Sequence, residues 1–462
     1  MKRRICNGIK IIILLIVLGG IFIWVNGILV GKSGMYRIVS FYEETEDSLD
    51  AVFIGSSHLY YSIYPFQLWE DYGIKSSVIG GDGVGIPLEY YCVKEAIREQ
   101  HPDVIVVDLY KAFSDQKLEN ISYMHNLVNA WPLSRNKIQM ISDLVPEENQ
   151  IEFYMPLYLY HTRWKEITES DFDRQTCYTK GAAPQFGIYD ASNFSELDKK
   201  EKQEVPRTAL TYIQKIIDVC AENKVELIFT VIPYETTAEE MDQQRIFNQL
   251  EDELKSENVL YYNGFHMIDE LGIDVKEDFF DSGHLNYNGG VKLSAYIGKI
   301  LSEKGIGNNS EKNDTWKVQD QLWHAYIDSK QINKIEDINE YIDFIRKKKY
   351  EYVILSSDGI ELFDGLQKVG IDEKTQFPEG ECVLIYNDGN RDIYALNTQQ
   401  ISVDFNGIWI ESKKGEKVAI TIGKNNYDFT ESTIVIVYDP VLGNIIDVVG
   451  ISDQEEKIDR KM

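Results

Sequence analysis

Short apolar runs alternate with amphipathic helical patterns through the first two thirds of the chain, and no other feature constrains the fold as strongly. Five of these runs are of the buried-strand type: AVFIG (51–55), SSVIGG (76–81), DVIVVDL (103–109), VELIFTVIP (225–233) and NVLYYN (258–263). Strands that are apolar on both faces, and that are separated by helices, form a parallel sheet with helices on both sides. The alternation therefore predicts an α/β domain with a parallel sheet, which a last helix over 289–305 closes.

Two parts of the chain depart from this alternation. The stretch from about 110 to 205 is typical of helices and loops inserted after the third strand. Residues 306–314 are polar and rich in Gly and Asn, as linkers are, and strand-like segments dominate between 350 and 439. One helix, over 335–349, is expected before those strands. We therefore predict a second, smaller and β-rich domain.

A run of 20 residues without charge, 11–30, follows a basic cluster in the first ten residues. As a helix it spans roughly 30 Å, the thickness of the hydrocarbon core of a bilayer. A cleavable signal peptide has a shorter apolar region and a small-residue cleavage site, and this run fits neither property. We therefore favour one uncleaved N-terminal transmembrane helix in the cell membrane, with the basic cluster cytoplasmic and the rest of the chain extracellular. The expected parts are a basic segment with its anchor (1–31), the α/β domain (32–305), a linker (306–319), the β-rich domain (320–455) and a charged tail (456–462).

The charge balance narrows the classes of partner. The chain has 75 acidic and 47 basic residues, for a net charge of −28. A surface this acidic repels phosphate backbones, so nucleic-acid binding is not expected. Five scattered cysteines without a CxxC pair make no disulfide scaffold, and no group of His, Cys and Asp has the spacing of a metal site. We therefore expect neither a metal nor another cofactor.

The first chemical motif is FIGSSH (53–58), at the end of the first strand. In open parallel sheets, ligands bind beyond the carboxyl ends of the strands. A serine on a Gly turn there, at the start of a helix, has an exposed hydroxyl and free backbone N–H groups nearby, as a nucleophile and its oxyanion site require. The alternative is a serine that only caps the helix.

The second motif is FFDSGHLN (279–286), before the last helix. Asp281 and His284 can point into one pocket from a single loop, where Asp281 orients a His284 ring that takes a proton from Ser57. By itself a loop with Asp and His is common. Because both motifs fall at the same edge of the predicted sheet, we favour a catalytic Ser57–His284–Asp281 site.

These motifs resemble those of the SGNH (GDSL-like) hydrolases, whose fold is a flavodoxin-like parallel sheet. The resemblance covers about residues 50–305 and implies that Ser57 is the nucleophile, His284 the general base and Asp281 its partner. It also implies an oxyanion site made by the N–H of Ser57 and by a glycine of IGGDGVG (79–85), either Gly81 or Gly83.

The sequence departs from the family pattern at two places. Ser56 stands where the GDS type has Asp, and the GxND block has no clear counterpart after DVIVVDL. Asn126 or Asn129 is an open candidate for the missing Asn. His58 adjoins Ser57 and is expected to line the pocket, whereas His101 precedes the third strand and is expected at the opposite edge of the sheet.

The GSSH form, the single anchor and the long insertion are similar to a membrane-anchored subgroup that modifies bacterial cell surfaces. It includes the D-alanine transfer protein of teichoic acid D-alanylation and the alginate O-acetylation proteins. The resemblance implies a cell-surface glycan as partner, and a membrane-bound O-acyltransferase as a second one. A motif-like segment of the insertion holds His161, Arg163 and Trp164, with Arg163 suited to a phosphate or carboxylate and Trp164 to a sugar face. The alternative is a helix-end salt bridge beside a packed Trp.

The region from about 320 to 455 is similar to the interleukin-like EMT inducer (ILEI/PANDER-like) domain, a β-sandwich-like fold. The usual disulfide is absent, because Cys382 is the only cysteine of the region. The resemblance implies glycan binding or positioning, and a purely structural role is equally open. The sequence as a whole predicts an extracytoplasmic serine acyl esterase or O-acyltransferase that acts on a cell-surface polysaccharide. A non-catalytic glycan-binding or assembly protein on the same scaffold is the alternative.

Overall fold

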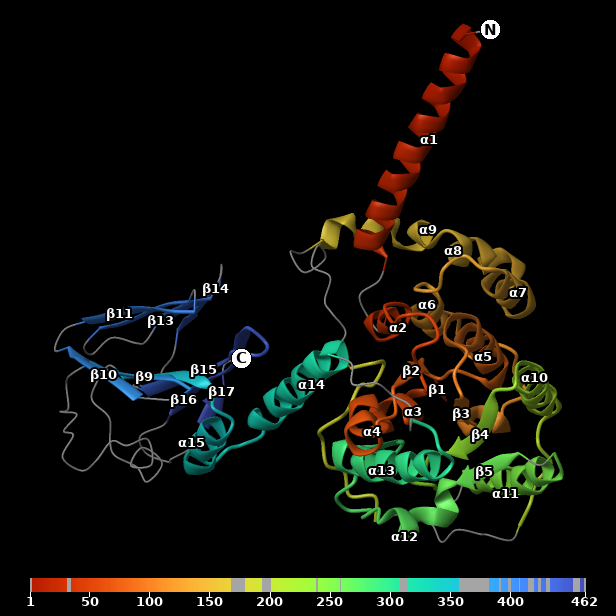
Figure 1. Ribbon diagram of the computed structural model, residues 1–462. Coiled ribbons are helices and arrows are strands. Elements are labelled where there is room, and N and C mark those ends of the chain that lie inside the picture. Colours follow the sequence, from red (N-terminus) through yellow and green to blue (C-terminus); the bar gives the residue numbers. More distant parts are fainter. Residues whose placement is uncertain are drawn as a thin grey trace. The chain divides into compact units, whose positions relative to one another are not determined.

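The chain forms two compact units in the computed structural model, Met1–Lys312 and Asn313–Met462 (Figure 1). The division falls within the expected linker, 306–319, but the last six residues of that segment are helical. The structure describes residues 2–30, 35–167, 179–192, 201–237, 240–257, 259–307, 314–356, 382–389, 392–397, 400–406, 408–413, 419–422, 425–428, 433–451 and 458–460.

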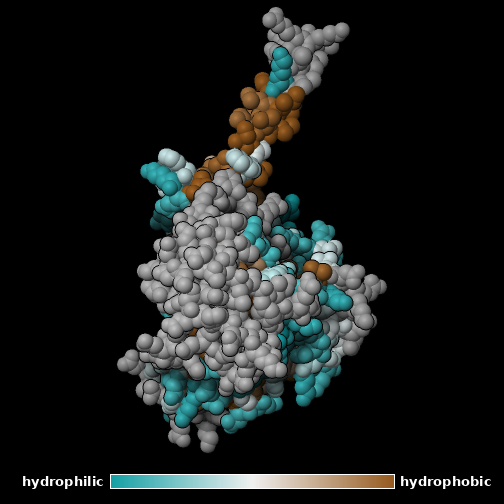
Figure 2. All heavy atoms as spheres, turned by 90° about the vertical axis from the view of Figure 1, so that its left-hand side faces the viewer, coloured by the Kyte–Doolittle hydropathy of each residue, from teal (hydrophilic) through white to brown (hydrophobic). Residues whose placement is uncertain are grey.

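The first unit begins with α1 (Lys2–Leu29), one long helix. Within the described residues, its segment Lys10–Leu29 is long and apolar enough to cross a membrane, and none of that segment is buried in the protein. Figure 2 shows this part of α1 as an apolar column. The expected N-terminal apolar helix is therefore present.

The predicted parallel sheet is confirmed. Its strands pair in the order β2-β1-β3-β4-β5, all parallel. β1 has neighbours on both sides that follow it in the chain, so the order reverses at β1 and creates the crevice in which such sheets bind ligands. The five strands are β1 (Ala51–Gly55), β2 (Ser76–Gly80), β3 (Val104–Asp108), β4 (Glu226–Val231) and β5 (Leu260–Asn263).

Helices cover the sheet, with α13 packed on α3 and α4, and α5 packed on α10. Phe53 and Val106 of the sheet belong to the same buried cluster as Leu293 and Ile297 of α13. The helices are α2 (Met35–Tyr42), α3 (Ser57–Ser62), α4 (Pro65–Tyr72), α5 (Ile86–Gln100), α10 (Arg207–Asn223), α11 (Met241–Ser256), α12 (Ile268–Leu271) and α13 (Tyr287–Glu303), with the 3-10 turn η5 (Gly264–Met267) before α12.

The insertion after β3 consists of short helices and loops where it is described, as the broken alternation predicts. They are η1 (Tyr110–Phe113), α6 (Ile121–Val128), α7 (Arg135–Leu144), η2 (Glu147–Asn149), α8 (Gln150–Tyr154), α9 (Pro156–Tyr160) and η3 (His161–Glu166).

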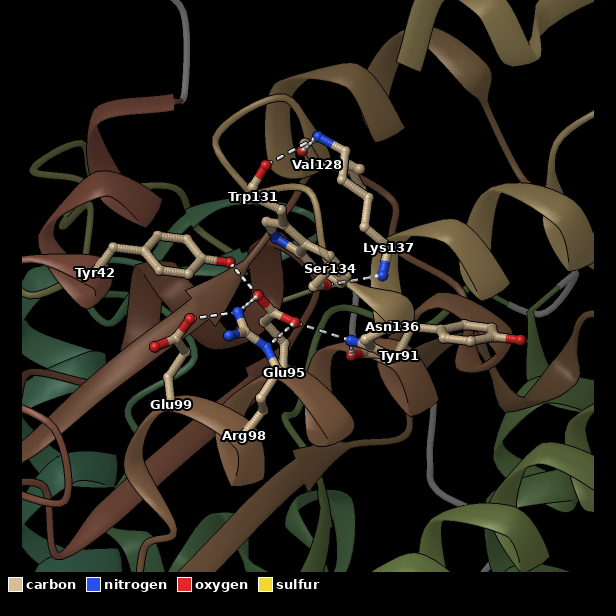
Figure 3. A network of polar contacts seen from close by, with 10 residues as sticks. All are labelled: Tyr42, Tyr91, Glu95, Arg98, Glu99, Val128, Trp131, Ser134, Asn136 and Lys137. Atoms are coloured by element: carbon tan, nitrogen blue, oxygen red, sulfur yellow. Dashed lines mark hydrogen bonds and ion pairs between the residues drawn. The ribbon is translucent and has the colours of Figure 1, made fainter. Parts of the chain in front are cut away.

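A buried polar network fastens the insertion to the sheet domain (Figure 3). Glu95 of α5 accepts hydrogen bonds from the Tyr42 hydroxyl at 2.8 Å, from Arg98, and from the Asn136 amide of α7 at 2.9 Å. Lys137 donates from Nζ to the carbonyls at the end of α6 and in the following turn, at 3.1 and 2.9 Å. A buried carboxylate with this many donors is satisfied, so the network fixes α2 and α7 on α5.

The second unit is rich in β-structure, as predicted. Val353, Leu355 and Ile436 of one sheet pack with Phe405 and Ile410 of the other, so two sheets share a core. Its helices are α14 (Asp314–Ile332) and α15 (Ile338–Lys347). The larger sheet has the order β10-β9-β8-β15-β16-β17 and comprises β8 (Glu351–Ser356), β9 (Cys382–Asp388), β10 (Asp392–Asn397), β15 (Thr433–Asp439), β16 (Asn444–Ile451) and β17 (Ile458–Arg460). The smaller has the order β11-β12-β13-β14 and comprises β11 (Gln400–Phe405), β12 (Ile408–Lys413), β13 (Ala419–Ile422) and β14 (Asn425–Asp428).

Candidate active site

Ser57 lies where β1 passes into α3, at the reversal of strand order. Ser56 caps the helix, and its hydroxyl accepts a hydrogen bond from the N–H of His58 at 3.3 Å. Ser57 is the first helical residue, so its own N–H has no partner within the helix. Gly55 is needed at this turn, because a Cβ there would lie 2.8 Å from the Cβ of Asp108. The capping role is thus taken by Ser56, which leaves the Ser57 hydroxyl available.

His284 and Asp281 lie on a tight β-ribbon, β6 (Phe279–Asp281) and β7 (His284–Leu285), directly before α13. The Gly283 N–H donates to Asp281 Oδ1 at 2.8 Å and fixes the carboxylate. The Glu235 N–H donates to the Ser282 carbonyl at 2.8 Å and holds the ribbon against the segment that follows β4. The loop is therefore positioned by the carboxyl edge of the sheet.

The three side chains form a continuous line. Ser57 Oγ lies 2.8 Å from His284 Nε2, although the two residues are 227 positions apart. His284 Nδ1 lies 2.8 Å from Asp281 Oδ1. A carboxylate only accepts, so Nδ1 carries the proton and Nε2 is the acceptor that faces the serine hydroxyl. This is the arrangement of a nucleophile, a general base and the group that orients the base.

Aromatic side chains surround the His284 ring. The ring centres of His58 and Tyr61 lie 4.8 and 4.9 Å from that of His284, and the Tyr110 ring lies tilted against His58, with 3.8 Å between ring centres. His58 is 3% exposed, and burial, together with His284 and Lys111, lowers its pKa well below the usual range. A neutral His58 therefore forms part of the wall, in the position expected from the sequence.

The two glycines that the sequence left open have different surroundings, and the choice between them as oxyanion donors stays a prediction. The N–H of Gly81 donates to the carbonyl of Gly55 at 3.3 Å, which competes with a bound oxyanion. Gly83 follows in a left-handed conformation, with φ of +56°, and lies beside Tyr123. Asn129 is bonded to His125 and to the Tyr160 hydroxyl, at 3.2 and 3.3 Å.

The residues predicted to bind substrate lie in η3, which contacts the C-terminal end of α1. Arg163 Nη1 donates to the Leu29 carbonyl at 2.8 Å, and His161 Nδ1 lies 2.7 Å from the carbonyl of Tyr158. Trp164 is 63% exposed, so it is not the packed Trp of the structural alternative. The structure gives none of the three a bond to Ser57, Asp281 or His284, and their role in substrate binding stays a prediction.

Sequence reasoning missed Asp108, the last residue of β3. It is fully buried beneath the turn, and Ser56 Oγ donates to its Oδ2 at 3.4 Å. Burial raises the pKa of Asp108 to about 7, although hydrogen bonds from the Ile232 N–H, the Ser56 hydroxyl and the Tyr110 N–H oppose the rise. The acidic residue just before the end of DVIVVDL was the available signal.

Comparison with known proteins shows that the chain is similar to solved structures, two of which are described next. The chain is similar to a candidate acylhydrolase from Bacteroides fragilis, with 10% identity, coverage of 55% of this chain and 86% of that one, and a TM-score of 0.28. It is also similar to a GDSL-like lipase from Bacteroides thetaiotaomicron, with 10% identity, coverage of 58% and 99%, and a TM-score of 0.28. No protein-family model and no curated protein matches the sequence. At this similarity the fold assignment rests on the strand order and the register of the sheet.

Proposed function

We propose that the protein is an extracytoplasmic serine acyl esterase or O-acyltransferase that acts on a cell-surface polysaccharide. The observation that carries the chemistry is the line from Ser57 Oγ through the His284 ring to Asp281, with 2.8 Å at each step. The candidate membrane span and the motifs shared with surface-modifying proteins support the location and the substrate class.

In the first half of the reaction, Ser57 Oγ attacks the carbonyl carbon of an ester while its proton passes to His284 Nε2. Asp281 stabilises the imidazolium that forms. The N–H of Ser57 and that of Gly83 are the proposed donors to the oxyanion. When the intermediate collapses, the C–O bond to the alcohol breaks, and His284 returns the proton to the departing oxygen. The product is an acyl ester on Ser57.

In the second half, a hydroxyl group resolves the acyl-enzyme with His284 again as base. If the hydroxyl belongs to water, the protein is an esterase. If it belongs to a sugar, the protein is a transferase, and a membrane-bound O-acyltransferase is a suitable partner to supply the acyl group. The two activities use the same residues and differ only in the acceptor.

A non-catalytic glycan-binding protein is the second candidate. The observation that favours it is the oxyanion site, because the Gly81 N–H is bonded to Gly55 and Asn129 is bonded within the insertion. A site that lacks donors loses about 10²–10³ in rate for each donor removed. Such a protein would bind glycan without turning over esters.

Labelling with a fluorophosphonate and turnover of a chromogenic acetyl ester test the proposal. We expect Ser57→Ala to abolish both. Ser62→Ala is the matched control, because Ser62 is buried in the same helix and its hydroxyl bonds only the local carbonyl of His58. Thermal unfolding must show that both variants fold. Equal labelling of the wild type and Ser57→Ala would exclude this nucleophile, and no labelling of either would favour the glycan-binding protein.

A further inference from the structure

Large apolar side chains gather on the solvent side of residues 151–167, which we call the 151–167 surface. Outside α1, the described residues include fifteen large hydrophobic side chains that are exposed, and seven of them lie in this stretch of the insertion. Monomeric soluble proteins rarely expose such a cluster without a partner. The seven are Ile151, Tyr154, Met155, Tyr158, Leu159, Trp164 and Ile167.

The other side of the same segment is packed. Phe153 is 1% exposed and stacks on the ring of His125 at 3.9 Å. His125 Nε2 in turn lies 3.3 Å from Glu152. The segment is therefore held by one face, and it presents its apolar face outward as part of the fold.

The 151–167 surface is joined to the end of α1. Arg163 Nη1 donates to the carbonyl of Leu29 at 2.8 Å, and the carbonyl of Ile28 is 3.5 Å away. These carbonyls belong to the last turn of α1, where they have no partner within the helix and attract a cation. Leu29 and Val30 are buried, whereas the side chains from Ile11 to Leu18 are all more than half exposed. The segment thus meets the candidate span at its outer end.

A bilayer fits this surface better than a soluble partner does. A span of 20 residues places its last turn near the edge of the hydrocarbon core, and Trp and Tyr are enriched at that depth. Lys165 lies with Nζ 5.7 Å from the ring centre of Trp164, so a cation accompanies the aromatic group, as in interfacial segments. The chain carries a net charge of −28, so its attachment has to come from apolar contact more than from attraction to anionic lipids.

We propose that the 151–167 surface lies in the headgroup region of the outer leaflet and forms a second, interfacial contact with the membrane. This inference rests on the proposed anchoring of the chain by α1. It gives Trp164 a lipid environment and makes Arg163 a positioning residue that ties the surface to α1.

Quenching of tryptophan fluorescence by brominated lipids tests the proposal on the full chain. The protein is reconstituted in vesicles of phosphatidylcholine and phosphatidylglycerol, with bromines near the headgroup or deeper in the acyl chain. The Trp164 signal is the difference between the wild type and Trp164→Phe. The Trp24 signal, from the wild type and Trp24→Phe, reports the insertion of α1 separately. The control is Leu260→Trp in the Trp164→Phe background, because Leu260 is exposed on β5, a strand that pairs only with β4.

We expect quenching of Trp164 that is stronger for the shallow bromines, and none at position 260. Quenching of Trp24 without any quenching of Trp164 would overturn the proposal while the anchor stands, and this is also the result if the surface contacts a membrane protein instead. Absence of quenching at both positions would overturn the anchor itself. Neither result bears on the labelling of Ser57.

Discussion

At the scale of single residues, the hydrogen bonds that each side chain already makes decide which role it can take in the site. Ser56 is occupied with the helix cap, and the carboxylate of Asp281 is held by the N–H of Gly283 and by the His284 ring. The meeting of Ser57, His284 and Asp281 was predictable because both motifs fall at the same edge of the predicted sheet, and their catalytic roles stay a prediction. Asp108 was not predictable as a neighbour, since its importance comes from packing against Gly55, and two sequence positions do not reveal such a contact.

Asp108→Asn should change how stability depends on pH. The pKa of Asp108 is raised to about 7 in the folded protein and is about 3.9 in the unfolded chain. Between these values the folded state keeps a proton that the unfolded state releases, so the free energy of unfolding falls as pH rises from about 4 to about 7 and then levels off. The variant lacks this dependence, which amounts to at most about 1.4 kcal/mol per pH unit.

Urea unfolding across this pH range measures the difference between wild type and variant. Asp242→Asn is the control, because the Asp242 side chain is 62% exposed. Parallel curves for the wild type and Asp108→Asn would contradict the raised pKa.

At the scale of elements, the first three strands were predictable to within a few residues because both their faces are buried. Helix α14 was not expected, since part of it falls in the polar segment taken as a linker. Helix α2 ends at Tyr42, and Asp47 adopts a φ of +55° in the loop that follows. Strands β11 and β12 pair with each other and are joined by a turn at Asn406, whose φ is +51°. Single left-handed residues of this kind carry no reliable signal in a sequence.

The contact between α13 and α4 yields a prediction for Gly298. A Cβ at this position would lie 2.6 Å from the ring of Tyr72 and 2.7 Å from Leu68, which are on α4. Gly298→Ala should therefore lower the free energy of unfolding by about 1–3 kcal/mol through overpacking. Chemical denaturation measures it, with Lys299→Ala on the exposed face as a control expected to change little. An unchanged midpoint for Gly298→Ala would show that the helices do not pack this closely.

At the scale of the whole molecule, each unit has its own core. Ser57, Asp281 and His284 all belong to the first unit, and α15 packs on the larger sheet of the second within a separate cluster. The polar segment between the α/β pattern and the strand-rich region indicated this division in the sequence. The role of the insertion was harder to predict, because an Arg and a Trp close together in a sequence fit a sugar and a lipid headgroup equally well until their neighbours are known.

A chain that ends after Lys312 should fold and react with the fluorophosphonate at the rate of the full chain, because it keeps the sheet and all three site residues. If the second unit binds glycan, the shortened chain should lose affinity for the polysaccharide alone. The measurements are the labelling rate and co-sedimentation with purified cell walls, with the Ser57→Ala full chain as the control for binding without turnover. Loss of labelling on shortening would mean that the first unit depends on the second.

The short join between α1 and the rest of the first unit limits how far Ser57 can lie from the end of α1. Only five residues separate Leu29 from Met35, where α2 begins, and they reach at most about 18 Å when fully extended. On an anchored chain, this connection is too short for Ser57 to reach through the thickness of a cell wall. If the chain acts on glycans as proposed, acylation or deacylation takes place close to the lipid surface, as the polymer emerges and before it is carried outward.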